Sequence, residues 1–260
     1  MADGTQVKGV ADIVILLDVS GSMQDCIDAV KRSVSDFITS YSSSDANGAA
    51  PITDWRMKIV GYRDFEAGPS DWFVDNPFVN DVAAVQAQLS AENMRASGGG
   101  DEPESLLDAL IKLAKMDQSG VQDPVDPNKW RARGTCARSI IFFTDATFKT
   151  IIKIPEAAGG TVVDVNTAIV QNRIFLAGFC PEWEGYDALA QADKAQITRV
   201  AKLIDTPALA GFGKSSDEVK AAQLASVAAL KAAVANPTYF KETLATLAKT
   251  LQKSAHTELA

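Results

Sequence analysis

Apolar residues in this 260-residue chain occur in short, nearly continuous runs separated by stretches with helical spacing. The runs predict strands at residues 13–17, 57–62, 140–144 and 174–179, with a further strand within 72–79. Strands that are apolar on both faces are typical of a sheet covered by helices on both sides. The pattern therefore predicts an α/β fold around a mostly parallel sheet.

Apolar residues three and four positions apart predict the helices between these strands. The first covers 22–41, and Asn80-Asp81 is expected to cap the next. A glycine-rich loop leads into a helix with Pro103 in its first turn, where a missing N–H is tolerated. The remaining helices are expected at 82–92, 165–171, 186–205, 216–235 and 238–254, with a capping box at Ser215 and Glu218 and a break at Asn236-Pro237.

Composition narrows the function classes. The chain is 47% hydrophobic and 22% charged, which is typical of a globular protein. Its net charge of −8 argues against a nucleic-acid partner. We find no signal peptide and no bilayer-spanning stretch, so a cytoplasmic protein without a membrane partner is expected. Cys26, Cys136 and Cys180 are expected to be reduced thiols, with a disulfide or zinc role as the alternative.

The segment Asp18-Val19-Ser20-Gly21-Ser22 directly follows the first predicted strand. A carboxylate and two hydroxyls on one tight loop suit a hard cation such as Mg²⁺. Asp145 follows the 140–144 strand, and Asp101 lies on the glycine-rich loop. Because ligands bind at the carboxyl edge of open α/β sheets, the three loops are expected to converge there. The candidate metal ligands are Asp18, Ser20, Ser22, Asp101 and Asp145.

Each candidate also has a structural explanation. Asp18 and Ser20 could cap the helix that follows them, although capping does not explain the coincidence with Asp145. Asp101 is an equally good cap. Asp64 is expected to form an ion pair with Arg63 or another basic residue, with an outer-shell metal role as the alternative.

Asp18-x-Ser20-x-Ser22, followed much later by Thr144-Asp145, resembles a von Willebrand factor A domain with its metal-ion-dependent adhesion site. Two further motifs, Gly61-Tyr62-Arg63-Asp64 and Gly98-Gly99-Gly100-Asp101-Glu102-Pro103-Glu104, resemble an intracellular subclass that includes domains attached to alpha-kinases and some bacterial domains. The resemblance implies one Rossmann-like domain over residues 1–260. Its core covers about 10–205, and the helical part at about 206–260 supplies a last helix that completes the fold.

The resemblance also implies a function. We expect a metal-dependent adaptor that binds a partner protein through or beside Mg²⁺, with Mn²⁺ or Ca²⁺ as alternatives. Family members imply an AAA+ ATPase, a kinase or a stress-response component as partner. Integrin-type domains supply a threonine where this chain has Asp101. A third carboxylate should retain the metal more tightly and attract an acidic partner residue less strongly.

The alternative function is a Mg²⁺-dependent phosphohydrolase with a carboxylate nucleophile. No second carboxylate follows Asp18 closely, and His256, the single histidine, lies near the C-terminus, where we expect it to be exposed. No Ser/His/Asp or Cys/His arrangement is therefore available, and a binding module is favoured.

Two long loops are candidate interaction surfaces. The segment 146–165 leaves the metal edge, so Phe148 and Lys149 are candidate partner contacts, with an ordinary long loop as the alternative. A basic loop around Lys129 and Arg131 is expected at the opposite edge of the sheet.

Overall fold

A six-stranded sheet forms the centre of the computed structural model. The structure describes residues 9–44, 50–98, 103–181, 183–192, 195–199, 221, 225, 228–229 and 231–256. The strands are β1 (Val10–Asp18), β2 (Asp54–Tyr62), β3 (Phe73–Asp75), β4 (Ala137–Phe143), β5 (Ile174–Cys180) and β6 (Ala195–Arg199). Their order is β3-β2-β1-β4-β5-β6; only β3 is antiparallel to its neighbour. The mostly parallel α/β sheet predicted from the sequence is confirmed.

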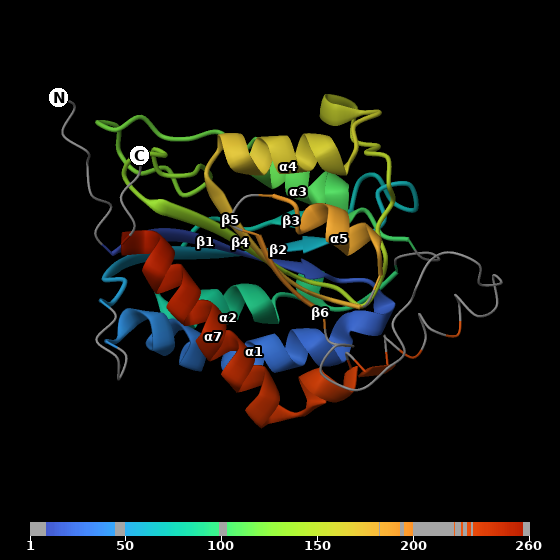
Figure 1. Ribbon diagram of the computed structural model, residues 1–260, viewed down its shortest axis with the longest axis horizontal. Helices are drawn as coiled ribbons and strands as arrows, with labels where there is room; N and C mark the ends of the chain where they lie inside the picture. Colours follow the sequence, from blue (N-terminus) through green and yellow to red (C-terminus); the bar gives the residue numbers. More distant parts are fainter. Residues whose placement is uncertain are drawn as a thin grey trace.

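Helices cover both faces of this sheet (Figure 1). They are α1 (Gln24–Ser42), α2 (Val82–Ser90), α3 (Leu106–Ala114), α4 (Val162–Gln171), α5 (Gly185–Leu189) and α7 (Pro237–His256), with short 3-10 turns η1 (Gly21–Met23), η2 (Glu92–Met94) and η3 (Pro155–Ala157). Successive strand side chains point to opposite faces. In β1, Ile13 and Ile15 therefore pack in the core beneath α1, α2 and α7, whereas Val14 and Leu16 pack beneath α3, α4 and α5.

The last helix lies on the same face as α1. Phe240, Leu244, Leu247 and Leu251 are all buried, as their spacing predicts. Phe240 packs against Phe143 of β4 and Phe179 of β5. Helix α7 thus covers the centre of the sheet. Of the preceding predicted helix, the described residues from 231 to 235 are helical, and its proposed capping residues Ser215 and Glu218 lie outside the described part of the chain.

The predicted helix at 186–205 is wrong at residues 190–192 and 195–199. Helix α5 ends at Leu189, and β6 pairs in parallel with β5, with Ala195 opposite Leu176. Without β6, the backbone N–H and C=O groups on that side of β5 would form an open sheet edge. This long-range pairing outweighs the local helical spacing. The helix expected at Pro103 also begins later, at Leu106.

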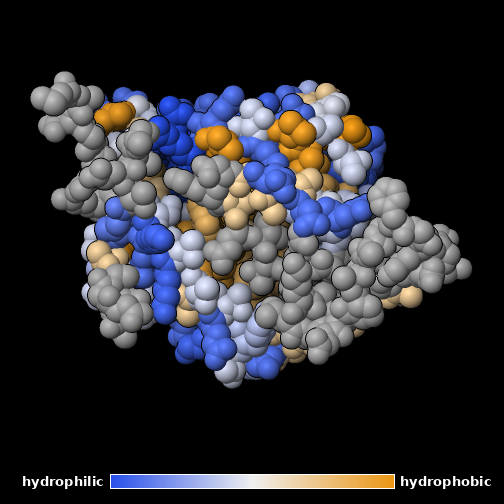
Figure 2. Space-filling view, in the orientation of Figure 1, coloured by the Kyte–Doolittle hydropathy of each residue, from blue (hydrophilic) through white to orange (hydrophobic). Residues whose placement is uncertain are grey.

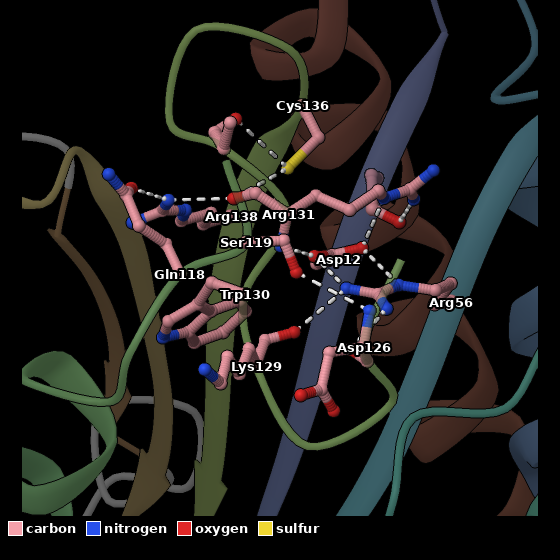
Figure 3. A network of polar contacts seen from close by, with 12 residues as sticks. Asp12, Arg56, Gln118, Ser119, Asp126, Lys129, Trp130, Arg131, Cys136 and Arg138 are labelled. Atoms are coloured by element: carbon pink, nitrogen blue, oxygen red, sulfur yellow. Dashed lines mark hydrogen bonds and ion pairs between the residues drawn. The ribbon is translucent and has the colours of Figure 1, made fainter. Parts of the chain in front are cut away.

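The basic loop lies at the amino edge of the sheet, as predicted. Asp12, near the start of β1, is completely buried and accepts hydrogen bonds from Arg56 on β2 and Arg131 on the loop (Figure 3). The Trp130 indole, also buried, donates to the carbonyl of Leu113 at 3.0 Å. These side chains hold the loop against the sheet and thereby stabilise the fold.

Apolar side chains remain exposed on the side of the molecule that carries α4. Figure 2 shows them gathered along that side, and Val163 and Val170 of α4 are 67% and 47% exposed. None of the helices in the described ranges combines the length and apolar character required to cross a bilayer.

Candidate metal centre

The candidate centre lies where β1 and β4 end side by side. Leu17 pairs with Phe143 in the sheet, so Asp18 and Thr144 leave the two strands at the same level. The hydroxyl of Thr144 donates to Asp18 Oδ2 at 2.7 Å, and the backbone N–H of Ser20 donates to Asp18 Oδ1 at 2.9 Å. Because the connections after β1 and β4 run in opposite directions across the sheet, this is its topological switch point, where open α/β sheets bind ligands.

A second hydrogen bond connects the same two loops. Ser22 Oγ donates to Asp145 Oδ1 at 2.8 Å. Asp145 is 3% exposed, and its Oδ2 atom has no hydrogen-bond partner among the described residues. The structure therefore brings together four of the five predicted ligand residues, namely Asp18, Ser20, Ser22 and Asp145.

The glycine-rich loop approaches from a third direction. The backbone N–H of Ser97 donates to the carbonyl of Val19, and that of Gly21 donates to the carbonyl of Gly98, both at 3.0 Å. Gly98 has a φ of +63°, a conformation that glycine adopts without strain. Asp101, the fifth predicted ligand, lies outside the described residues.

Capping does not account for the serines. Ser20 precedes η1, but its side chain makes no capping hydrogen bond, and α1 also starts without one. Ser22 instead donates to Asp145 of the distant loop. The Ser22 hydroxyl is therefore directed to the contact between the loops rather than to the helix.

Burial disfavours the charged form of both carboxylates in the candidate centre. It raises the pKa of Asp18 to about 6, against hydrogen bonds from Ser20 and Thr144 that lower it. Burial likewise raises the pKa of Asp145, while the hydrogen bond from Ser22 and the charge of Lys231 lower it. Two buried carboxylates with raised pKa values would be stabilised by a cation.

The donor atoms suit Mg²⁺. Carboxylate and hydroxyl oxygens are hard ligands, and Asp145 Oδ2, which has no hydrogen-bond partner among the described residues, could coordinate the ion. In the part of the chain that the structure describes, no three His, Cys, Asp or Glu side chains are arranged to hold a metal ion. Mg²⁺ needs only one or two carboxylates because it keeps several waters. Asp18 and Asp145 with the two serine hydroxyls fit this requirement.

Glu104 is a third buried carboxylate that sequence reasoning did not select. It is 3% exposed, and Oε2 has no hydrogen-bond partner among the described residues. Its backbone joins the loop after β4 through hydrogen bonds with Thr147 and Lys149. Burial, together with the charges of Asp18 and Asp64, raises the pKa of Glu104 to about 8. Its position in the Gly98–Glu104 motif was the sequence feature that could have identified Glu104 as a candidate site residue.

We expect Glu104→Gln to change how stability depends on pH. A pKa raised to about 8 means that the native state holds a proton that the unfolded chain has released above about pH 4.5. The wild type should therefore lose unfolding free energy as pH rises from 5 to 8, and the glutamine variant should lose less. Urea unfolding in chelator at several pH values would measure this. If the unfolding free energies of the wild type and Glu104→Gln changed equally with pH, Glu104 would not have the raised pKa.

The predicted partner contact at Phe148 is wrong. Its side chain is 3% exposed and packs against Trp183 and Tyr186, with ring centroids 4.6 and 5.2 Å away. An aromatic side chain in this loop gains more from burial in the adjacent core than from exposure.

Lys149 is also engaged within the chain. Its Nζ atom lies 2.5 Å from Asp64 Oδ1 and 2.6 Å from Glu66 Oε2, and its side chain is only 15% exposed. Asp64 therefore has the predicted ion-pair role, with Lys149 as its partner. Arg63 instead donates to backbone carbonyls, including that of Ser97 at 2.9 Å.

Comparisons with known proteins give a distant structural likeness. No family model and no curated protein matches the chain. Proximal thread matrix protein 1 from the mussel byssus superposes with a TM-score of 0.46 at 12% identity, over 88% of this chain and 47% of that one. The open conformation of the pilus adhesin SpaC from Lactobacillus rhamnosus GG gives 0.44 at 13% identity, over 85% of this chain and 30% of that one. This chain thus spans less than half of either structure.

Proposed function

We propose that this chain is a von Willebrand factor A domain that binds a partner protein through or beside a Mg²⁺ ion at the ends of β1 and β4. The observation that carries the proposal is the pair of hydrogen bonds, Thr144 to Asp18 and Ser22 to Asp145, that joins the two motif loops. These hydrogen bonds join the loops that follow β1 and β4 at the switch point of the sheet, which supports a metal site there.

The chain's own residues would have distinct roles in such a site. Ser20, Ser22 and Asp145 offer oxygen atoms, and Asp18 holds the first loop through its hydrogen bond from Ser20. Thr144 keeps the Asp18 carboxylate oriented. When bound, the cation would supply an open coordination position for an oxygen atom of a partner. An adaptor for a cytoplasmic ATPase, kinase or stress-response assembly remains the expectation from the resemblance.

The features that a phosphohydrolase requires are weak in this site. A nucleophilic carboxylate must reach its substrate, but Asp18 is 0% exposed and both of its oxygens accept hydrogen bonds. His256 ends α7, whose Ala255 contacts Gly9 at the start of β1. That end of the sheet is opposite Asp18. A binding module is therefore the better-supported proposal.

Mg²⁺ should stabilise the protein through this site. At a concentration about 100 times the dissociation constant, a ligand specific for the native state adds roughly 2.7 kcal/mol. We expect Mg²⁺ to raise the melting temperature, and the double variant Ser20→Ala, Ser22→Ala to lose the increase. Calorimetric titration would check the affinity directly.

The matched control is Ser40→Ala with Ser90→Ala. Each control serine hydroxyl forms an exposed hydrogen bond to a carbonyl one helical turn earlier, Ser40 to Asp36 and Ser90 to Gln86. This variant should keep the full increase. If the wild type shows none at millimolar Mg²⁺, the proposed site is wrong. Co-purification of the tagged protein with and without chelator would then test whether a partner depends on the metal.

A further inference from the structure

A lysine of the C-terminal part of the chain faces the candidate metal centre. Lys231 Nζ lies 3.9 Å from Asp145 Oδ2, the carboxylate oxygen that has no hydrogen-bond partner among the described residues. This separation is too long for a hydrogen bond, for which N···O distances of about 2.7–3.2 Å are usual. The ammonium group therefore balances the charge of Asp145 without saturating the oxygen.

The backbone that carries Lys231 is anchored, whereas its side chain is partly exposed. Ala233 and Val234, two and three residues further along, are 8% and 3% exposed and belong to the core beneath α1 and α7. The side chain of Lys231 is 43% exposed, and that of Asp145 is 4% exposed. A lysine ammonium on a flexible four-carbon stem can move away without any change in the fold.

Lys149, at the same edge of the sheet, forms closer ion pairs than Lys231 and provides a comparison. Its ammonium lies within hydrogen-bond distance of both Asp64 and Glu66, and its side chain is 15% exposed. Among the described residues, Lys231 has a single, longer ion-pair contact, and its side chain has nearly three times the exposure. The two lysines thus differ in how easily a cation could replace them.

We propose that Lys231 is a built-in counter-ion that competes with the divalent cation for Asp145 and so raises the Mg²⁺ concentration at which the centre fills. This inference rests on the proposed function and adds a regulatory element to it. The physical basis is that a positive charge about 4 Å from a metal ligand repels the incoming cation. Metal binding should in turn release the Lys231 ammonium into solvent.

Calorimetric titration with Mg²⁺ tests the competition. We expect Lys231→Gln to bind Mg²⁺ roughly tenfold more tightly than the wild type, because one nearby positive charge is removed. Lys231→Arg keeps the charge and should bind like the wild type. The difference between Lys231→Gln and the wild type should shrink in high salt, since half-exposed charges are screened. Equal affinities for the wild type and Lys231→Gln at low salt would overturn the inference.

The control is Lys241→Gln. Lys241 forms an exposed ion pair with Asp36, 2.9 Å away, on the same face of the sheet. Asp36 lies twelve residues beyond the start of α1 at Gln24, roughly 18 Å along the helix axis. This variant changes the net charge equally but should leave Mg²⁺ affinity unchanged. An equal gain in both glutamine variants would overturn the inference in favour of a general charge effect.

Lysine acetylation followed by mass spectrometry provides a readout independent of affinity. In the wild type, Mg²⁺ should increase the acetylation rate of Lys231 relative to that of Lys241. An unchanged ratio, with Mg²⁺ binding measured by calorimetry, would overturn the competition but leave the metal centre intact. If no variant and no wild-type sample binds Mg²⁺, the proposed function itself is overturned, together with the inference.

Discussion

Asp12→Ala is expected to lower the free energy of unfolding by about 3–5 kcal/mol. Asp12 is fully buried and accepts hydrogen bonds from Arg56 Nη2 at 2.6 Å and from the side chain and backbone N–H of Arg131 at 2.7 and 2.8 Å. Its removal leaves two largely buried guanidinium groups without their shared carboxylate. Urea unfolding followed by circular dichroism would measure the loss.

Asp54→Ala is the matched control. Asp54 also pairs with Arg131, at 2.8 Å, but its side chain is 62% exposed. Exposed ion pairs contribute about 0–1 kcal/mol, so this variant should stay close to the wild type. Similar losses in the two variants would contradict the distinction between buried and exposed pairs. The folded fraction of either variant should keep its Mg²⁺ affinity, because the network lies at the opposite edge of the sheet.

Asp18→Asn is expected to change stability in opposite directions with and without metal. Burial raises the pKa of Asp18 from 3.8 to about 6, so the native state holds this proton more tightly than the unfolded chain. The metal-free wild type should therefore lose about 3 kcal/mol as pH rises from about 4 to 6. The asparagine variant lacks this loss and should be the more stable protein in chelator at pH 7.5.

With Mg²⁺ the order should reverse. The cation stabilises the ionised Asp18 of the wild type, whereas a neutral amide attracts it less strongly. The Mg²⁺-dependent increase in melting temperature should thus be large in the wild type at pH 7.5, smaller at pH 5, and nearly absent in Asp18→Asn. Thermal unfolding with and without Mg²⁺ at both pH values would check this.

Asp81→Asn provides the control for the same chemical change. Asp81 caps α2 by accepting from the backbone N–H of Ala84, and asparagine caps equally well. Neither the pH profile nor the Mg²⁺ increment should change in this variant. An Asp18→Asn protein that keeps the full Mg²⁺ increment would remove Asp18 from the candidate centre.

Much of the fold and part of the centre follow from local patterns. The apolar runs of β1 and β4 predict buried parallel strands, and such strands have their carboxyl ends at a common edge. Asp18 and Asp145 directly follow these runs, so their convergence could be predicted from the sequence. The buried face of α7 could also be predicted from the sequence, because Phe240, Leu244 and Leu247 follow the helical period.

Contacts between distant segments could not be predicted in this way. The pairing of β6 with β5 depends on an open sheet edge that no local spacing encodes. The burial of Phe148 depends on Trp183 and Tyr186, which lie more than 30 residues away in the chain. Local patterns describe which face of a segment is apolar but not which other segment covers it.

The same division applies to the chemistry of the centre. The spacing of Asp18, Ser20 and Ser22 behind a strand indicates oxygen ligands on one loop from the sequence alone. Only the tertiary structure shows that Glu104 is buried with no hydrogen-bond partner for Oε2 among the described residues. It alone also shows that Lys231 lies 3.9 Å from Asp145 Oδ2. The physical reason is that burial and charge balance depend on every segment that reaches a site, whereas residue type and periodicity belong to each segment separately.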